Sequence, residues 1–295
     1  MLWIAATLIA AAAQTARNAM QSSLTATLGT AGATQVRFLY GFPFSLLFLA
    51  IVFMATGVSV PAPRPAFLLY TIMGALAQIG ATALMLAAMQ ARSFSVAIAF
   101  TKTEPVQVAV FGLLLLGDAL TWLRALAIVV ATLGVFLIAV KPGDQWDRQN
   151  LKPALYGIVS GSLFALAAVG FRGGILALGE APWFMRATTT LVWSLGLQAL
   201  LLGAWMTLFD RGALMGSFRQ WRSSLFAGGM GSFASQCWFV GMSLTSAANV
   251  RTLGLVEVVF AQVVSRRVFR QQVSARELAG LILVVAGVLM LLAGL

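Results

Sequence analysis

The chain of 295 residues contains no histidine and only one cysteine, Cys237. Histidine is the usual general base at neutral pH and the commonest metal ligand, so Ser-His-Asp catalysis and histidine zinc sites are excluded. A Gly-x-x-x-x-Gly-Lys-Ser/Thr phosphate loop is also missing, which excludes nucleotide hydrolysis by that route. The sequence therefore predicts no cofactor and no metal ion.

Charged residues are scarce at 9%, whereas hydrophobic residues make up 60% of the chain. Apolar runs of about 20 residues match the ~30 Å hydrocarbon core of a bilayer, so we expect a multi-pass membrane protein in the cell (inner) membrane. The formal net charge is +11, but the basic residues lie mostly in short loops, where they set orientation and meet lipid head groups. The predicted partners therefore include the bilayer and exclude nucleic acid.

Gly, Pro and charged residues divide the apolar runs into ten predicted spanning helices. We place these helices at residues 2–27, 34–56, 66–90, 93–116, 119–140, 152–178, 181–209, 221–244, 246–269 and 274–294.

An internal repeat is indicated by a shift of 153 positions, which superposes Glu104 on Glu257 and Gly134 on Gly287. Five helices per half is an odd number, so the second half must enter the membrane from the opposite side. The predicted fold is all-α, with ten transmembrane helices as a 5+5 inverted repeat around a central cavity. The halves would be residues 1–145 and 146–295.

The orientation of this repeat follows from its basic residues. Lysine and arginine concentrate in the loops after the odd-numbered helices. By the positive-inside rule these loops would be cytoplasmic and both termini would lie outside.

The segment Thr101-Lys-Thr-Glu-Pro-Val-Gln107 lies inside the fourth predicted helix. A charge at the centre of a spanning helix costs about 2.5–3.5 kcal/mol, so Lys102 and Glu104 should face a cavity, water or charged partners. They cannot pair with each other, because two positions along a helix correspond to about 200° of rotation. We expect Pro105 to kink the helix and to act as a hinge.

Three polar residues of this segment, Thr101, Glu104 and Gln107, share one helix face at a spacing of three. In the second half, Glu257 occupies the position that matches Glu104, and Arg251 lies on the same helix. We expect the two carboxyl groups to mark the centre of a transport pathway. The alternative is that these charges form static salt bridges between helices.

The first helix carries a polar stripe, since Gln14, Arg17, Asn18 and Gln21 follow the i, i+3, i+4, i+7 spacing of one helix face. This stripe favours the lining of a cavity, and interhelical hydrogen bonding is the alternative. The full set of predicted cavity residues is Gln14, Arg17, Asn18, Gln78, Thr82, Thr101, Lys102, Glu104, Gln107, Phe164, Arg172, Gln236, Trp238, Phe239, Arg251 and Glu257.

Several motifs resemble the drug/metabolite transporter superfamily, in its branch of ten-helix EamA-type proteins, and within it the YddG-type amino acid exporters. The residues that carry the resemblance are Arg37-Phe38, Pro105, Gly117-Asp118-Ala119-Leu120-Thr121 and Gly134-Val135. Val258 stands where a second proline is common in that family.

This resemblance implies export of small metabolites, such as aromatic or neutral amino acids, sugars or cationic compounds, from a central cavity with both termini cytoplasmic. A zwitterion would suit Glu104 and Glu257 for its ammonium, with Arg17, Arg172, Lys102 or Arg251 for its carboxylate. Transport could be coupled to protons if a glutamate titrates, or be facilitated diffusion. The alternatives are a membrane-embedded enzyme acting on lipid-linked substrates and a static scaffold or receptor subunit.

Overall fold

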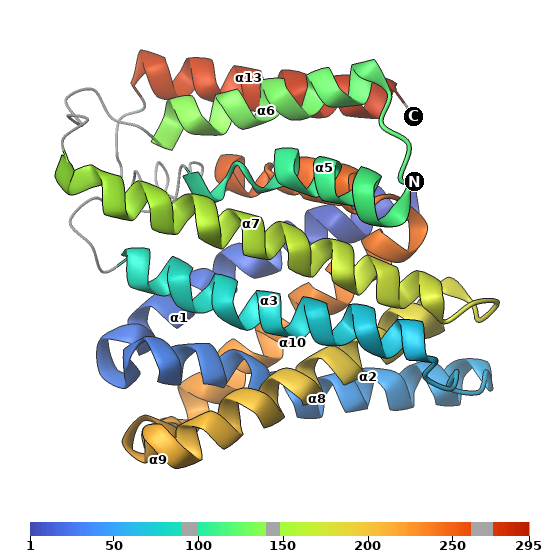
Figure 1. The fold of residues 1–295 in the computed structure, drawn as a ribbon, viewed down its shortest axis with the longest axis vertical. Helices are drawn as coiled ribbons and strands as arrows, with labels where there is room; N and C mark the ends of the chain where they lie inside the picture. The colour runs from blue at the N-terminus through green and yellow to red at the C-terminus, as the bar shows by residue number, and fades with distance from the viewer. Residues whose placement is uncertain (90–99, 140–147, 261–273, 295) are drawn as a thin grey trace. The chain divides into compact units, whose positions relative to one another are not determined.

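The computed structural model describes residues 1–89, 100–139, 148–260 and 274–294, and the regular elements in these ranges are all helices (Figure 1). They are α1 (Leu2–Leu39), α2 (Gly41–Thr56), α3 (Pro65–Met89), α5 (Glu104–Leu116), α6 (Trp122–Ala139), α7 (Arg148–Ala177), α8 (Trp183–Phe209), α9 (Arg211–Arg219), α10 (Trp221–Leu244), α11 (Ala247–Gly254) and α13 (Ala275–Ala293).

Within the described ranges, five helical stretches are long and apolar enough to cross a membrane. They are Thr27–Thr56, Pro65–Ala87, Leu155–Ala177, Trp183–Phe209 and Ala275–Ala293. Shorter apolar helices cover Glu104–Leu116 and Trp122–Ile138. The all-helical, multi-pass character is therefore confirmed, while the number of ten spans and their inverted arrangement stay predictions.

The structure has a helix break between the first two predicted helices. We expected a break at residues 28–33, and the helical conformation of α1 is interrupted inside this range at Gly29, whose φ is +68°. Glycine adopts this conformation without the steric cost that a Cβ atom would bring. Gly29 is the one residue of α1 with a non-helical conformation, and the helix continues from there to Leu39.

A short helix, α9, occupies a stretch that we expected to be a loop. It begins after Asp210, whose side chain accepts a hydrogen bond of 3.1 Å from the backbone N–H of Ala213. An N-cap of this kind satisfies one of the amide groups that the first turn of a helix leaves without a partner.

The described chain forms two compact units, and each unit draws on both halves of the sequence. Unit 1 comprises Met1–Ile79 and Ala167–Thr245, and unit 2 comprises Gly80–Leu166 and Ser246–Leu295. The predicted repeat boundary between residues 145 and 146 lies outside the described residues, so it stays a prediction.

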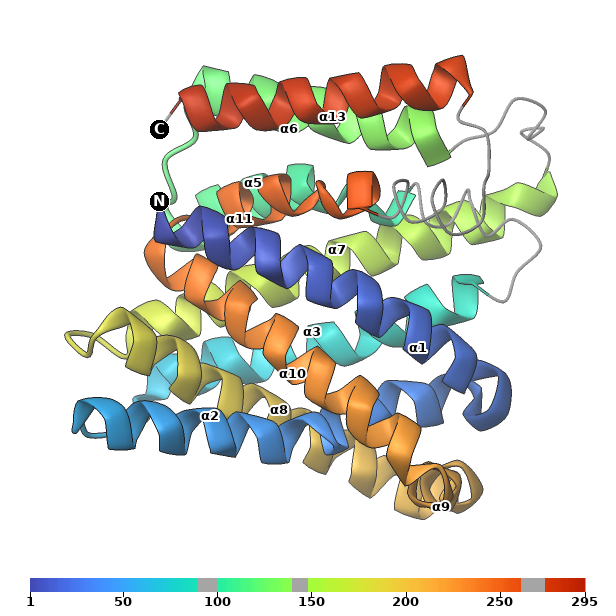
Figure 2. The ribbon, with the colours of Figure 1, turned by 180° about the vertical axis from the view of Figure 1, so that it is seen from behind.

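In unit 1, α1 packs along α10, and α2 packs against α8 and α10 (Figure 2). The approach of α10 to the α1–α2 junction depends on Gly228. A Cβ atom at this position would lie 2.4 Å from the Cβ atom of Tyr40, which is too close for two carbon atoms that are not bonded to each other. Glycine therefore lets the two backbones meet.

In unit 2, α6 and α13 lie side by side, as Figures 1 and 2 both show, and α5 packs against α11. A Cβ atom at Gly134 of α6 would lie 2.6 Å from the carbonyl oxygen of Gly280. A Cβ atom at Gly287 of α13 would likewise lie 2.6 Å from the backbone nitrogen of Ala131. The two glycines that the repeat superposes thus serve one helix interface, from opposite sides.

Candidate functional site

Two helical segments of unit 2 are interrupted at matching positions. A turn at residues 102–103 precedes α5, and a turn at residues 255–256 separates α11 from the helical residues 257–260. The two turns are separated by the shift of 153 positions that superposes Glu104 on Glu257. Each glutamate is therefore the first helical residue after its interruption.

The backbone hydrogen bonds at the two turns also match. The N–H group of Thr103 donates to the carbonyl oxygen of Phe100 over 3.2 Å. At the positions 153 residues later, the N–H group of Val256 donates to the carbonyl oxygen of Leu253 over 3.1 Å. Both are i to i−3 bonds, which tighten the chain relative to an α-helix and leave it ready to change direction.

Pro105 lies in the first turn of α5 rather than inside a continuous helix. A proline is well tolerated there, because the N–H group that it lacks would have no partner within the helix. Val258 occupies the matching position after the second turn, so that interruption forms without a proline. The break thus begins before Pro105, and the second one does not require a proline at all.

Four charged side chains meet at the two interruptions, in crossed pairs. The Lys102 ammonium contacts a carboxylate oxygen of Glu257, and their side chains are 24% and 9% exposed. The Arg251 Nε atom lies 3.2 Å from a carboxylate oxygen of Glu104, and these side chains are 11% and 14% exposed. We call Lys102, Glu104, Arg251 and Glu257 the charged quartet.

The crossed arrangement follows from helix geometry. Lys102 and Glu104 project in different directions, as the sequence predicted, so each finds its counter-charge on the other broken segment. Two cations and two carboxylates make the quartet neutral, which suits a weakly hydrated environment. No group of three or more His, Cys, Asp or Glu side chains that could hold a metal ion occurs in the part of the chain that the structure describes.

Four other predicted cavity residues belong to unit 2. Thr101 and Gln107 are close to the quartet in the sequence, Thr82 lies on α3, and Phe164 lies on α7. Gln107 donates to the hydroxyl oxygen of Thr103 over 2.9 Å, so its amide supports the turn. Thr101 and Thr82 are buried, and so is Phe164.

The polar stripe of α1 belongs to unit 1, and three of its four side chains, those of Gln14, Arg17 and Asn18, make hydrogen bonds, while the side chain of Gln21 lies outside the described part of the chain. Trp238 of α10 donates its indole N–H to the amide oxygen of Gln14 over 3.0 Å. Arg17 is only 4% exposed and donates to the amide oxygen of Asn18 over 2.6 Å. The bond to Trp238 joins two helices, which is the alternative that the sequence left open for this stripe.

Arg172 lies on α7 and caps the end of α10. Its guanidinium donates to the carbonyl oxygen of Met242 over 2.7 Å and also to that of Thr245. A cation at a helix C-terminus satisfies carbonyl groups that have no partner within the helix. Phe239 packs against Phe171, with 5.0 Å between ring centroids, in the same part of unit 1.

Gln78 and Gln236, two predicted cavity residues of unit 1, each make a hydrogen bond to a side chain of α8. Gln198 donates to the amide oxygen of Gln78 over 2.8 Å, and Gln236 donates to the hydroxyl oxygen of Thr188 over 2.9 Å. The sequence reasoning missed Gln198 and Thr188. Gln198 had a usable signal, because an amide in an apolar span of 27 residues needs a partner.

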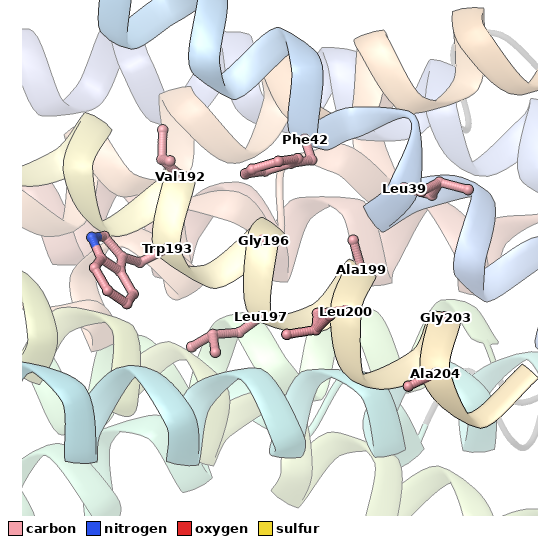
Figure 3. A pocket seen from close by; sticks show the side chains of 10 residues that line it. All are labelled: Leu39, Phe42, Val192, Trp193, Gly196, Leu197, Ala199, Leu200, Gly203 and Ala204. Atoms are coloured by element: carbon pink, nitrogen blue, oxygen red, sulfur yellow. The ribbon is translucent and has the colours of Figure 1, made fainter. Parts of the chain in front are cut away.

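A groove with a volume of about 660 Å³ opens in unit 1 along α8 (Figure 3). None of the predicted cavity residues lines it, and its wall is almost entirely apolar. The lining residues are Leu39, Phe42, Val192, Trp193, Gly196, Leu197, Ala199, Leu200, Gly203 and Ala204.

The structure therefore brings together one predicted set, the charged quartet, while the other predicted residues make separate hydrogen bonds or packing contacts. Apolar helices that are interrupted at charged residues, in a multi-pass membrane protein, are a recurrent feature of one class of membrane protein, the secondary transporters.

Comparison with known proteins agrees with that class. The model of the EamA-like transporter family matches residues 1–140 and 152–293. The chain therefore belongs to the EamA-like transporter family, whose members are membrane transporters rather than enzymes.

A solved structure described as "Crystal structure of protein" shares the fold. It has a TM-score of 0.72 and 17% sequence identity, and the match covers 99% of each chain. The comparison with curated proteins gave no match.

Proposed function

We propose that this transporter exports small zwitterionic metabolites, with neutral and aromatic amino acids as the leading substrates, and that the charged quartet is its substrate contact. The crossed ion pairs at two matching helix interruptions are the observation that carries this proposal. Charged groups in a membrane-embedded bundle are costly, and their usual role is in a substrate or ion pathway.

A zwitterion can exchange with the quartet without changing its net charge. The substrate ammonium can take the place of Lys102 at Glu257 or of Arg251 at Glu104, while its carboxylate pairs with the displaced cation. Charge-assisted hydrogen bonds of this kind are roughly twice as strong as neutral ones. A ligand with a single charge would leave one partner uncompensated, which is strongly unfavourable in a buried place.

The aromatic side chain of a substrate can pack against an aromatic residue that is close to the quartet in the sequence. Phe100 lies just before the first interruption and meets Phe136 edge-on, with 5.6 Å between ring centroids. Edge-to-face packing adds to the free energy of burying an aromatic ring. This favours aromatic and other apolar amino acids over sugars.

We further propose the 5+5 inverted repeat and a mechanism of alternating access through a midplane cavity. The matching interruptions support the repeat, because they fall at the same shift as the two glutamates. The family match, which consists of two segments of similar length, supports it as well. Interrupted helices are a recurrent feature of inverted-repeat transporters and provide positions where segments can tilt.

The driving force is also a proposal. A proton on Glu104 or Glu257 would release its cation, so a proton gradient could drive export; facilitated diffusion is the alternative. We place the transporter in the cell (inner) membrane. The remaining predicted cavity residues, Gln14 and Phe164 among them, stay predictions for the lining of the substrate path.

The test is exchange of labelled amino acids in proteoliposomes. Wild-type protein should exchange a neutral or aromatic amino acid, whereas Glu104→Gln and Glu257→Gln should each reduce the exchange rate by at least about tenfold, because each loses a charge-assisted contact of roughly 1.5–3 kcal/mol. The matched control is Glu180→Gln, since Glu180 is exposed. Unchanged exchange in both quartet variants would refute the proposed site.

The pH dependence of the same assay separates the driving forces. Proton coupling predicts uphill transport when only a pH gradient is imposed, and its loss in one of the two glutamine variants. Exchange without uphill transport would indicate facilitated diffusion.

A further inference from the structure

The surface formed by α9 and the first residues of α10 combines arginine with exposed apolar side chains. Residues 211–222 contain three arginines and no acidic residue, and the three arginine side chains are exposed. The large apolar side chains on the same stretch are exposed as well. The two sets are Arg211, Arg219 and Arg222, and Met215, Phe218 and Trp221.

Asp210 offsets one of the three arginines, so residues 210–222 keep a net charge of +2. Asp210 caps α9 through the N–H group of Ala213, and Arg211 donates to the carbonyl oxygen of Thr207 at the end of α8. A surface that combines arginines with exposed apolar side chains is typical of a segment that lies in the membrane interface and attracts anionic lipid.

A residue next to the groove in the sequence contacts this surface. Leu39 lines the groove, and the next residue, Tyr40, donates its hydroxyl to the carbonyl oxygen of Ser217 in α9 over 3.0 Å. The Tyr40 ring also lies 6.2 Å from the ring of Phe218. The groove runs along α8 between Trp193 and Ala204, with Phe42 above it in Figure 3, and Tyr40 connects the Leu39 side of the groove with α9.

The groove opens to the outside of a helix that is built to span a membrane. Leu200 lines it and is 68% exposed, and the wall offers almost no polar group to a ligand. Water in such a groove would lose hydrogen bonds, so a hydrocarbon chain is the favourable occupant.

We propose that unit 1 binds one anionic phospholipid, with its phosphate at Arg219 and Arg222 and one acyl chain in the apolar groove. Guanidinium groups bind phosphate through paired hydrogen bonds, which supplies selectivity for the head group. A second copy of this chain would bring like charges together at the same arginines, so the charge complementarity favours a lipid over a dimer.

The head-group part is tested by native mass spectrometry of the full chain in detergent with equal amounts of phosphatidylglycerol and phosphatidylcholine. Wild-type protein should retain phosphatidylglycerol preferentially. The double variant Arg219→Gln/Arg222→Gln should bind it about thirtyfold more weakly, and Arg64→Gln, which changes an exposed arginine in another connection, should not.

The groove part is tested with a matched pair of substitutions on α8. Ala204→Phe fills the groove and should reduce retention of both lipids at least about fivefold, because a buried chain segment is displaced. Leu208→Phe changes an exposed position of the same helix that does not line the groove, and it should have no effect. Circular dichroism and size-exclusion chromatography check that each variant is folded.

Three outcomes would overturn the proposal. They are equal retention of the two lipids by wild-type protein, equal behaviour of the double arginine variant and Arg64→Gln, and equal behaviour of the two phenylalanine variants. A wild-type dimer that Ala204→Phe dissociates would also overturn it. A rise in the thermal unfolding midpoint on adding phosphatidylglycerol, but not phosphatidylcholine, would support it in a second measurement.

Discussion

At the scale of single residues, the charged quartet combines low exposure with complete charge compensation. Glu257 is 9% exposed and Lys102 is 24% exposed, so removal of one partner leaves the other charge poorly hydrated. Breaking a buried pair from one side costs about 3–5 kcal/mol, whereas replacing both partners by apolar residues is often close to neutral. Because of this difference, the contribution of the Lys102–Glu257 ion pair to stability can be measured.

We predict that Glu257→Gln lowers the free energy of unfolding by about 3 kcal/mol and that the added substitution Lys102→Met recovers most of this loss. The physical reason is that the second change removes the charge that the first one left without compensation. Thermal unfolding in detergent, arranged as a double-mutant cycle, measures the coupling.

The control for this cycle is Glu180→Gln combined with Lys102→Met, since Glu180 is exposed. Purely additive effects in the Lys102 and Glu257 cycle would show that the ion pair contributes nothing to stability.

Arg172 binds backbone carbonyl groups, whereas Arg251 pairs with a carboxylate. The sequence offered Arg172 as a candidate for binding a carboxylate, and the structure uses its guanidinium to cap α10 through the carbonyl groups of Met242 and Thr245. Its donors are thus engaged in holding a helix end, which favours a structural role.

At the scale of elements, the interruption of a helix at residues 102–103 has a counterpart at residues 255–256. Only the first is followed by a proline, at position 105. Since Pro105 lies where an N–H group has no helical partner in any case, its replacement should cost little.

We predict that Pro105→Val changes the free energy of unfolding by less than about 1 kcal/mol and retains transport, because Val258 already fills the matching position after the second interruption. Val108→Pro in the interior of α5 is the control and should cost about 3 kcal/mol or more. Thermal unfolding and amino acid exchange measure both variants.

If Pro105→Val abolishes exchange while the protein stays folded, the proline is a functional hinge, as the sequence first suggested, and the interruption alone does not suffice.

At the scale of the whole molecule, membership of the EamA-like transporter family and the multi-pass character are established, and the number of spans is a prediction. Ten spans require that connections after even-numbered helices lie on one side of the membrane and those after odd-numbered helices on the other.

We predict that Val60→Cys and Leu120→Cys react with an impermeant thiol reagent from the same side of the membrane, and that Gly212→Cys reacts from the opposite side. The background is Cys237→Ser, which removes the natural thiol. Labelling of intact cells and of inverted vesicles measures the sides. It also decides between termini outside, as the loop charges predict, and termini in the cytoplasm, as the family resemblance implies.

Labelling of Val60→Cys and Leu120→Cys from different sides would contradict the ten-span arrangement, because the two positions are separated by two predicted helices.

The sequence by itself determined the multi-pass helical character and the family, and it predicted the equivalence of Glu104 and Glu257. These properties depend on local quantities: the length of apolar runs, the residue types at motif positions and the spacing of charges. It also indicated that Lys102 and Glu104 do not pair, since that follows from the rotation per residue in one helix.

Only the tertiary structure decided which charges pair, because the partner of Lys102 depends on how two broken segments pack, and periodicity within one segment does not encode that. The same holds for the bond between Gln78 and Gln198 and for the groove beside α8, whose walls come from residues more than 150 positions apart. Packing between distant segments is set by the fit of whole helix faces, so no local pattern in the sequence predicts it.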